Sequence, residues 1–414
     1  MIKKTTLGYL LWLLAGSALA QEVDTVRIMH YNILKYGYDW ACMPQSVKNN
    51  YLKTVFNAYR PDILTVNEIE PKASTINGLK TNTLQYNPAM TAAPYSNSNG
   101  SDIVNCLYYN ANKFGYLSSR ALKGNVRDID LHRLYHKAST SEGDTLDVWF
   151  IVVHMKASPG FEADRAEAAK DIGNWLTANR KIVRYLISGD FNLYGVTEPA
   201  WVTLTGGSSP HFIDPADMAT SGWHGPSFAA IHTQSPNDDS NDCAATGGMD
   251  DRFDFILNSP AIAAGTQDIE ILGYRAYGND GESYNEALDC SNTKSVSASV
   301  CQALRKGSDH LPVVMELSFP AKAIGGDSNL PFKAALLGNP ARTSLGVRLE
   351  TAESGSYRWD IINILGQRLA EGLEPVGAPG STFSISLPEM AAGSYFLTLR
   401  NGEDKALMLP FVKY

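Results

Sequence analysis

The chain has 414 residues with 44% hydrophobic content, which favours two folded domains over one. Its 35 Lys and Arg and 43 Asp and Glu give a formal net charge of -8, which argues against a tight, non-specific nucleic-acid binder with a basic surface. An enzyme that hydrolyses nucleic acid is compatible with this charge, because its site needs only a local positive field or a bound cation.

The N-terminus has the pattern of a secretory signal peptide. Two lysines precede the apolar run 7–15, and Ala18-Leu19-Ala20 provides the small residues of a cleavage site. We therefore expect residues 1–20 to be removed and the protein to be secreted, outside the cell or to its surface. The apolar run is too short to span a bilayer and no comparable run follows, so no stable membrane span is expected.

Apolar runs and helical patterns alternate through residues 24–319. Helical spacing over 47–59, ended by Pro61, and an Ala-rich stretch over 162–176 predict helices. Several apolar runs predict strands, and four of them deliver a polar side chain at the C-terminal end. If those ends lie on one side of the sheets, they form a single cleft in an α/β protein. The predicted strands are 26–34 with Asn32, 63–66 with Glu68, 146–153 with His154, 182–187 with Asp190, and 103–109, 253–257 and 311–317.

The stretch Ser188-Gly189-Asp190-Phe191-Asn192 follows one of these buried runs. A carboxylate and a carboxamide at i and i+2 share one direction on an extended backbone. Such a pair suits a phosphate and its cation, since the carboxylate handles a metal or a proton and the amide donates to an anionic oxygen. A simple turn explains Gly, Asp and Asn equally well. The stretch alone leaves both interpretations open.

Six motifs, taken in chain order, resemble those of the endonuclease/exonuclease/phosphatase superfamily over about residues 24–319. GDFN and SDHLP together are specific, whereas the other motifs are weak alone. The resemblance implies a four-layered α/β sandwich, in which two mixed sheets pack face to face with helices outside. The motifs are HYNIL with Asn32, DILTVNE with Glu68, VVHMKAS with His154, SGDFN with Asp190 and Asn192, RFDFIL with Asp254, and SDHLP with Asp309 and His310.

The resemblance implies a Mg²⁺-dependent phosphodiester hydrolase, with Mn²⁺ as an alternative ion. Glu68 would be the main metal ligand, with Asn32 and Asp309 close by. Asn32, Arg127 in RDID and Asn192 are the implied substrate-binding residues. Hydrolysis of a phosphodiester needs these groups on chemical grounds too, because a hard cation with oxygen ligands offsets the charge on the non-bridging oxygens.

The implied catalytic residues are His154, Asp190, Asn192, Asp254 and His310. His154 and Asn192 would contact the scissile phosphate, and Asp190 would orient or deprotonate the attacking water. Asp254 would hold His310, fix its tautomer and favour its charged form. Whether Asp190 or His310 takes the proton of the water stays open. Each residue also has an ordinary explanation, such as a core histidine, but their joint occurrence in family order favours the site.

Three departures from the family pattern leave the substrate open. Asn67 stands where Gln is usual, Glu70 stands where pancreatic deoxyribonuclease has an Arg that reads the DNA minor groove, and Leu34 replaces an acid of the exonuclease III-like members. We expect an endonuclease acting on DNA or RNA. The alternatives are a phosphomonoesterase, a sphingomyelinase-like lipid phosphodiesterase, and a surface binding protein without catalysis.

The five cysteines contain no CxxC pair. Cys290 and Cys301 are close enough in sequence to close a small loop in an oxidising compartment. Cys42, Cys106 and Cys243 leave at least one thiol unaccounted for.

The polar loop Thr233–Arg252 is a candidate site for a structural Ca²⁺. The spacing of its acids fits no EF-hand, and an ordinary solvated loop is the alternative. The acids are Asp238, Asp239, Asp242, Asp250 and Asp251.

The C-terminal part has short apolar runs at regular spacing, which predict a small all-β sandwich. It resembles the sorting domain of type IX secretion substrates, and this implies the type IX secretion machinery as a partner; a carbohydrate-binding or adhesive module is the alternative. The protein is expected to be a monomer. The motifs are Asn339-Pro340, Ile364-Leu365-Gly366-Gln367, Gly393-Ser394-Tyr395 and Val412-Lys413-Tyr414.

The whole chain is expected to divide into four parts. These are a signal peptide 1–20, a catalytic domain 21–319, a linker 320–331 and a sorting domain 332–414.

Overall fold

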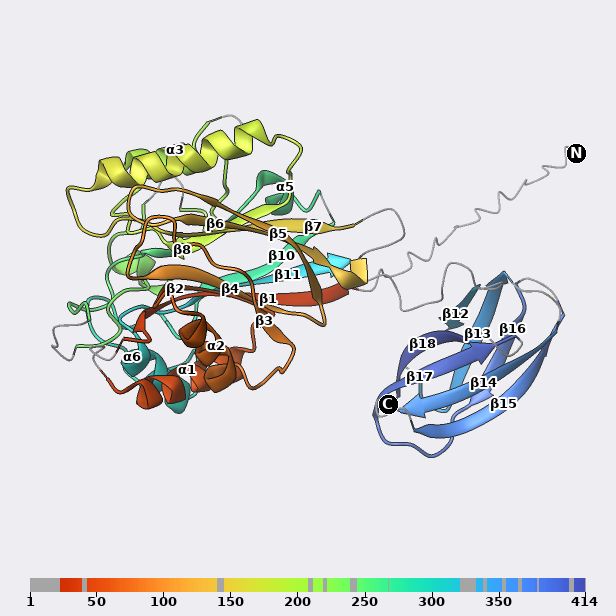
Figure 1. The fold of residues 1–414 in the computed structure, drawn as a ribbon. Coiled ribbons are helices and arrows are strands. Elements are labelled where there is room, and N and C mark those ends of the chain that lie inside the picture. The colour runs from red at the N-terminus through yellow and green to blue at the C-terminus, as the bar shows by residue number, and fades with distance from the viewer. Residues whose placement is uncertain are drawn as a thin grey trace, which may run out of the picture. The chain divides into compact units, whose positions relative to one another are not determined.

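A computed structural model describes most of the chain between Val23 and Lys413. The described residues form two compact units that separate at Pro320, and each unit is treated by itself (Figure 1). The expected signal peptide, nearly all of the expected linker, Cys42 and Cys243 lie outside the described residues. The described ranges are 23–38, 43–139, 145–207, 211–218, 222–238, 244–266, 268–320, 333–337, 341–351, 355–363, 367–377, 380–401 and 406–413.

Sheet A of the larger unit runs β10-β11-β1-β2-β4-β3. Its β1 and β2 are parallel, and the other neighbouring pairs are antiparallel. The helices α1, α2 and α6 supply residues to the apolar core on one face of this sheet. The elements are β10 (Glu270–Ala276), β11 (Val313–Pro320), β1 (Val23–Tyr36), β2 (Ile63–Ile69), β4 (Val104–Asn110), β3 (Met90–Ala92), α1 (Gln45–Tyr59), α2 (Ala73–Thr83) and α6 (Ala298–Gly307).

Sheet B of the same unit runs β5-β6-β7-β8-β9. Its β7 and β8 are parallel, and the other pairs are antiparallel. The long helix α3 lies along its outer side (Figure 1), and α4 packs in the same outer core. The elements are β5 (Phe114–Leu122), β6 (Ile129–His136), β7 (Asp147–His154), β8 (Tyr185–Asp190), β9 (Asp254–Asn258), α3 (Glu162–Ala178), α4 (Pro199–Thr205), α5 (Pro260–Ala263) and the 3₁₀ helices η1 (Lys137–Ser139) and η2 (Pro226–Ile231).

The two sheets pack face to face around a shared apolar core. Successive side chains of a strand point to opposite faces, so alternate residues of β1 divide between two cores. Val26 and Ile28 lie in the core between the sheets, whereas Met29 and Tyr31 lie in the core under the helices. The predicted four-layered α/β sandwich is therefore confirmed.

The same alternation places polar side chains in the layer between the sheets. His30 and Asn32 continue the inward-facing set of β1, and both are fully buried. Thr65 on β2 and Ser188 on β8 follow the same rule and are also buried. The inner layer thus changes from apolar to polar toward the C-terminal ends of β1, β2 and β8.

The smaller unit is an all-β sandwich, as predicted. One sheet runs β12-β13-β16 and the other runs β15-β14-β17-β18, and an apolar core fills the space between them. Of the sorting motifs, Asn339-Pro340 and most of Ile364-Leu365-Gly366-Gln367 lie outside the described residues. The strands are β12 (Lys333–Leu337), β13 (Ser344–Thr351), β14 (Gly355–Asn363), β15 (Arg368–Val376), β16 (Thr382–Ser386), β17 (Gly393–Arg400) and β18 (Ala406–Lys413).

The structure bears on two expectations from the sequence, the Cys290–Cys301 loop and the membrane span. Cys290 and Cys301 form a disulfide, which confirms the predicted loop, and Cys106 is a buried free thiol. Among the residues that the structure describes, no helix is both long and apolar enough to cross a membrane.

Removing the disulfide tests its contribution to the larger unit. The double variant Cys290→Ser/Cys301→Ser should lose about 3 kcal/mol of unfolding free energy, because the open loop gains conformational freedom in the unfolded chain. Urea unfolding of the full chain, followed by tryptophan fluorescence, measures the change. The exposed double variant Ser291→Ala/Ser299→Ala in the same segment is the control and should change by less than about 0.5 kcal/mol. An unchanged midpoint in the cysteine variant would contradict this account.

Candidate active site

Strands of both sheets deliver the predicted site residues to one place. Asn32 is paired in register with Asn67, next to Glu68, in the parallel β1/β2 ladder of sheet A. In sheet B, Asp190 lies in register with His154 on one side and with Asp254 on the other. A hydrogen bond from Asn32 to Asp190 and a 4.0 Å contact between Glu68 and His154 cross between the sheets and join these sets into a single cluster.

Asn32 links the two carboxylates at the centre of the cluster. Its Nδ2 donates to Oε1 of Glu68 at 3.1 Å and to Oδ2 of Asp190 at 3.0 Å. Its Oδ1 accepts the backbone N–H of Leu34 at 3.1 Å. The amide therefore holds a carboxylate of sheet A next to a carboxylate of sheet B. The predicted role of Asn32 in binding metal stays a prediction.

Glu68 is held by a backbone conformation that side chains rarely adopt. Its φ is 62°, in the left-handed region, and the β2 ladders shift register around it. On β1, Leu34 and Lys35 also have positive φ, and the Lys35 N–H donates to Oε2 of Glu68 at 3.1 Å. Left-handed backbone outside glycine costs of order 1–3 kcal/mol and clusters at functional sites. Here it turns the Glu68 carboxylate toward the cluster.

Asp190 is buried and surrounded by donors and by other acids. Its N–H donates to Oδ1 of Asn67 at 2.9 Å, and its Oδ1 accepts the N–H of Asn192 at 3.0 Å. Burial raises the pKa of Asp190 above its ordinary value. The charge of His310 opposes this rise, whereas the negative charges of Asp254 and Glu68 add to it. Such a carboxylate is a stronger base than an exposed one, and it is suited to accept a proton from water.

His310 and Asp254 form a short, buried pair. Nδ1 of His310 lies 2.7 Å from Oδ2 of Asp254, and Nε2 lies 3.7 Å from Oδ2 of Asp190. Burial alone would lower the pKa of His310, but the carboxylates of Asp254 and Asp190 outweigh it and hold that pKa well above its ordinary value. The imidazole is therefore charged at neutral pH, with Nε2 directed at the centre of the cluster.

His154 contributes a neutral ring to the same cluster. Its Nε2 lies 3.5 Å from Oδ2 of Asp190 and 4.0 Å from Oε1 of Glu68. Burial lowers the pKa of His154 well below its ordinary value, and the nearby Arg127 lowers it further. A neutral imidazole can donate a hydrogen bond to a phosphate oxygen without carrying a charge.

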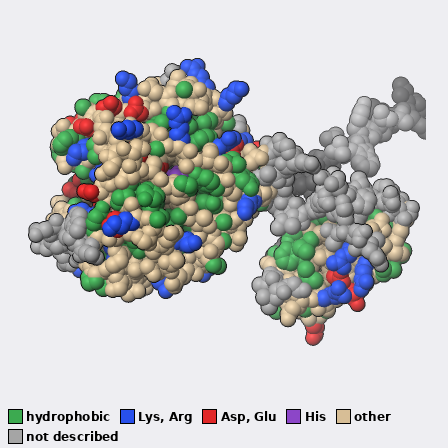
Figure 2. Space-filling view, viewed as in Figure 1, with side chains coloured by type: hydrophobic (Ala, Val, Ile, Leu, Met, Phe, Trp, Pro, Cys, Tyr) green, Lys and Arg blue, Asp and Glu red, His purple; other side chains and the backbone are tan. Residues whose placement is uncertain are grey.

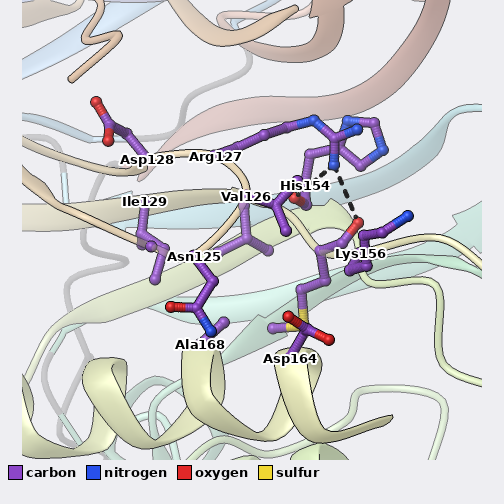
Figure 3. Close-up of a pocket in the computed structure, with 12 residues that line it drawn as sticks. Asn125, Val126, Arg127, Asp128, Ile129, His154, Lys156, Asp164 and Ala168 are labelled. Atoms are coloured by element: carbon purple, nitrogen blue, oxygen red, sulfur yellow. Dashed lines mark hydrogen bonds between the residues drawn. The ribbon is translucent and has the colours of Figure 1, made fainter. Parts of the chain in front are cut away.

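Arg127 lies beside His154 in a pocket formed by the loop before β6 and the segment after β7 (Figure 3). Its Nη1 donates to the carbonyl oxygens of His154 and Met155, each at 3.3 Å. Its Nε is buried and has no hydrogen-bond partner among the described residues. The Nδ2 of Asn192 donates to Met155 O at 3.4 Å, so two of the three predicted substrate-binding side chains, Arg127 and Asn192, are anchored on one short segment.

Asp309 is the predicted metal ligand that best fits a cation. Its Oδ2 accepts the N–H of Ala245 at 2.7 Å, whereas its Oδ1 is buried and lacks a hydrogen-bond partner within the described part of the chain. Glu68 keeps 14% of its side chain exposed. The described residues contain no group of three or more His, Cys, Asp or Glu arranged to hold a metal. One or two carboxylates completed by waters are nevertheless the usual protein contribution to a Mg²⁺ site, so this donor set fits the ion.

The candidate Ca²⁺ loop has only some of its acids in the described residues. Asp239 and Asp242 lie outside them, and Asp238 accepts a hydrogen bond from Arg305 at 2.5 Å. The backbone oxygen of Asp251 accepts the N–H groups of Thr233 and Gln234. A structural Ca²⁺ in this loop stays a prediction.

A relay of amides behind Asp190 is a feature that the sequence analysis missed. The Nδ2 of Asn67 donates to Oδ1 of Asn105 at 2.8 Å, and Asn105 donates in turn to Oδ2 of Asp130 at 3.1 Å. All three side chains are buried. The relay joins β2 and β4 of sheet A to β6 of sheet B, so it fixes the spacing of the sheets beside the site. Its sequence signal is polar residues at inward-facing positions of predicted strands.

Two other contacts also support the site. The side-chain amide of Gln234 lies 3.2 Å from Nε2 of His310, and nothing in the sequence analysis pointed to it. Because a charged imidazole donates from Nε2, the amide supports the site with its oxygen turned toward the ring. Arg165 on α3 is fully buried and donates to Lys156 O and Glu198, while Glu198 accepts the N–H of Tyr194. Arg165 thereby connects the segment after His154 with the loop that follows Asn192.

Comparison with known proteins gives structural similarities at low identity. No family model and no curated protein matches the chain. The human Nocturnin catalytic domain with bound sulfate anion is 16% identical over 72% of this chain and 97% of that chain, with a TM-score of 0.48. An endonuclease/exonuclease/phosphatase family protein from Bacteroides thetaiotaomicron is 14% identical over 72% and 99%, with a TM-score of 0.46. TDP2 from D. rerio complexed with single strand DNA product is 14% identical over 71% and 98%, with a TM-score of 0.47. Similarity at this level does not by itself assign a family or an activity to this chain.

Truncating Asn67 tests the relay. Asn67→Ala should cost about 1–3 kcal/mol of unfolding free energy, because it leaves the Asp190 N–H and the Asn105 carbonyl buried without partners. Urea unfolding of the full chain measures the loss. Asn77→Ala, at an exposed position of α2, is the control and should change the unfolding free energy by less than about 0.5 kcal/mol. Equal midpoints for the two variants would show that the relay does not hold the sheets.

Proposed function

We propose that the larger unit is a metal-dependent phosphodiesterase of the endonuclease/exonuclease/phosphatase superfamily, and that it is an endonuclease hydrolysing DNA or RNA. One observation carries this proposal: Glu68, Asp190 and His310 are far apart in the sequence, yet they belong to one buried, interconnected cluster. That cluster offers oxygen ligands for a cation, a strong carboxylate base and a charged imidazole. Hydrolysis of a phosphodiester requires these three elements.

Glu68 and Asp309 are the residues that would hold Mg²⁺, or Mn²⁺ in its place. When bound, the ion would offset negative charge on the non-bridging oxygens of the phosphate. Within the described part of the chain, Oδ1 of Asp309 has no hydrogen-bond partner; this supports the assignment, since a buried carboxylate oxygen without a donor is costly unless a cation satisfies it.

The remaining residues divide into groups that bind the phosphate and groups that move protons. Arg127, Asn192 and neutral His154 would donate hydrogen bonds to phosphate oxygens. Asp190 would take the proton from the attacking water, because burial and nearby acids raise its pKa. Charged His310, whose Nε2 lies 3.7 Å from Oδ2 of Asp190, would stabilise the negative charge that develops on the reacting phosphate.

Nucleic acid is the proposed substrate. Two features argue against strong contacts between the protein surface and the grooves of a duplex. On the face shown in Figure 2, Lys and Arg side chains are scattered over the larger unit among apolar and acidic ones. The Glu70 carboxylate is buried; it forms an ion pair with Lys72 at 2.5 Å and accepts a hydrogen bond from Thr75 at 2.7 Å, so its neighbours already engage it. Recognition would therefore depend mainly on the phosphate-binding residues. A phosphomonoesterase or lipid phosphodiesterase would use the same cluster.

Secretion through the type IX machinery is proposed from sequence motifs. The signal-peptide pattern in residues 1–20 supports export. The β-sandwich of the smaller unit is compatible both with a sorting domain and with an adhesive module. The two alternatives differ in what happens to the smaller unit during export. A sorting domain is removed or is used to attach the protein.

A substrate panel tests the proposed activity. The mature full chain should cleave plasmid DNA or RNA in the presence of Mg²⁺, and a chelator should abolish the cleavage because the cation is needed to offset phosphate charge. Sphingomyelin and a generic phosphomonoester complete the panel. Cleavage of only the lipid or only the monoester would overturn the nuclease assignment.

Single variants of the cluster, assayed on the same substrates, test the assignment of the site residues. Glu68→Ala and His310→Ala should each lower kcat/KM by about 100-fold or more, because each removes a group that acts on the reacting phosphate. Glu282→Ala and His224→Ala change the same residue types at exposed positions and should leave the rate unchanged. Full activity in the first pair would remove the site assignment.

The pH dependence tests the pairing of His310 with Asp254. The Asp254 carboxylate helps to raise the pKa of His310, so hydrolysis that needs the charged imidazole should fall only at alkaline pH. Asp254→Asn removes this charge and lowers the pKa of His310. The alkaline limb of kcat/KM should therefore move to lower pH, with an overall loss of about 100-fold or more. The control is Asp268→Asn, which changes an exposed carboxylate. If the alkaline limb of Asp254→Asn stays in place, Asp254 does not raise the pKa of His310 as assigned.

A further inference from the structure

Behind Asp254 lies a second histidine, His30 of β1, which the proposed mechanism does not use. Its ring is fully buried, and its Nε2 lies 3.4 Å from Oδ1 of Asp254. The other oxygen of this carboxylate, Oδ2, lies 2.7 Å from Nδ1 of His310. Each oxygen of Asp254 thus faces one imidazole. His30 Nε2 and Asp254 Oδ1 have no hydrogen-bond partner of good geometry within the described residues, so their 3.4 Å contact is the polar contact that the structure gives to both atoms. His30 lies on the far side of Asp254 from the cluster, so it acts on the reaction only through that carboxylate.

The opposite nitrogen of His30 continues into a chain of hydroxyl groups. Its Nδ1 lies 3.1 Å from Oγ1 of Thr65, and that oxygen lies 2.9 Å from Oγ of Ser188. If Ser188 donates to Thr65 and Thr65 donates to Nδ1, the proton of a neutral His30 sits on Nε2 and points at Asp254. The other tautomer would direct a lone pair at a buried carboxylate, which is electrostatically unfavourable.

We propose that His30 is a positioning residue for the proposed hydrolysis, in which its neutral ring donates from Nε2 to Oδ1 of Asp254 and fixes this carboxylate for His310. The inference rests on the proposed function and adds a residue to its machinery. With Oδ1 engaged by a donor, Asp254 cannot rotate away from His310 without losing a buried hydrogen bond.

A core histidine that only fills space is the ordinary alternative, and the same layer of the molecule contains one. His132 on β6 is 1% exposed, and neither of its ring nitrogens has a hydrogen-bond partner in the described part of the chain. The Nε2 of His30 likewise has no hydrogen-bond partner of good geometry among the described residues, but it lies 3.4 Å from a carboxylate oxygen, and Nδ1 contacts the Thr65 hydroxyl. The contrast provides a matched control, since His132→Leu removes a buried imidazole without touching Asp254.

The tautomer of His30 can be measured without any substrate. Long-range ¹H–¹⁵N NMR of the full chain labelled at histidine should show one neutral ring protonated at Nε2 that disappears from the spectrum of His30→Leu. A His30 ring protonated at Nδ1 would overturn the proposal, because it could not donate to Asp254. This outcome does not depend on whether the enzyme hydrolyses nucleic acid.

Steady-state kinetics test the positioning role. His30→Leu should lower kcat by about 10- to 100-fold with little change in KM, since the residue supports a catalytic group but does not contact substrate. His30→Gln, which can still donate to Asp254, should recover most of the rate. In the Asp254→Asn background, His30→Leu should cost nothing further, because its effect passes through that carboxylate.

The outcomes separate the two proposals. Suppose that the wild type hydrolyses a phosphodiester, and that His30→Leu and His132→Leu have the same kcat and the same unfolding midpoint. The positioning role of His30 would then be wrong, and the proposed function would stand. Additive losses in the double variant would also overturn the positioning role. A wild type that is inactive on every phosphodiester would overturn the proposed function, and the NMR measurement would then decide the His30–Asp254 contact alone.

Discussion

Burial of several carboxylates in one small volume is the constraint on which the rest of this structure depends. Asp190, Asp254 and Asp309 are each less than 10% exposed, and Glu68 lies beside them. Charges of the same sign in such a place are stable only if donors or cations satisfy them. The amide of Asn32, the imidazole of His310 and backbone N–H groups satisfy most of the oxygens. Among the described residues, Oδ1 of Asp254 and Oδ1 of Asp309 have no hydrogen-bond partner; the first faces His30, and the second is where the proposed divalent ion would bind.

The two sheets make this arrangement stable because each carries half of it. Sheet A brings Asn32 and Glu68, whereas sheet B brings Asp190 and Asp254, and the relay from Asn67 to Asp130 joins the sheets beside them. Backbone conformations that are unfavourable elsewhere persist at Glu68 and Asn192 because the surrounding hydrogen bonds determine them. Stability and chemistry are therefore linked, since the bonds that hold the sheets together also orient the reacting groups.

Much of the fold follows from local sequence patterns. Apolar runs located strands near β1, β2, β4, β7, β8, β9 and β11, because the buried residues of these strands are strongly apolar. Helical spacing located α1, and an Ala-rich stretch located α3. Strand β6 was missed because the sequence IDLHRLYH mixes charged and apolar residues, and only the structure shows that Asp130 and His132 are buried between sheets. Strand β15, with an exposed and charged pattern, was missed for a similar reason.

The site was partly accessible to the same reasoning. Polar residues at the ends of apolar runs indicated Asn32, Glu68, His154 and Asp190, whereas Asp254 and His310 were found through motif resemblance. His30, Asn105 and Gln234 were missed because their partners are distant in sequence, and a contact between such positions depends on how the sheets pack. Nothing local to a strand reveals which residue of the opposite sheet it will meet.

The central claim is that the Glu68 and Asp309 carboxylates share one divalent cation beside Asp190 and His310. Crystals of the full chain grown with Mn²⁺, measured at the manganese absorption edge, test it most directly. The account predicts a single strong anomalous peak in the larger unit, with carboxylate oxygens of Glu68 and Asp309 among its ligands. A peak elsewhere in the unit, or no peak between these two side chains at saturating Mn²⁺, would contradict it.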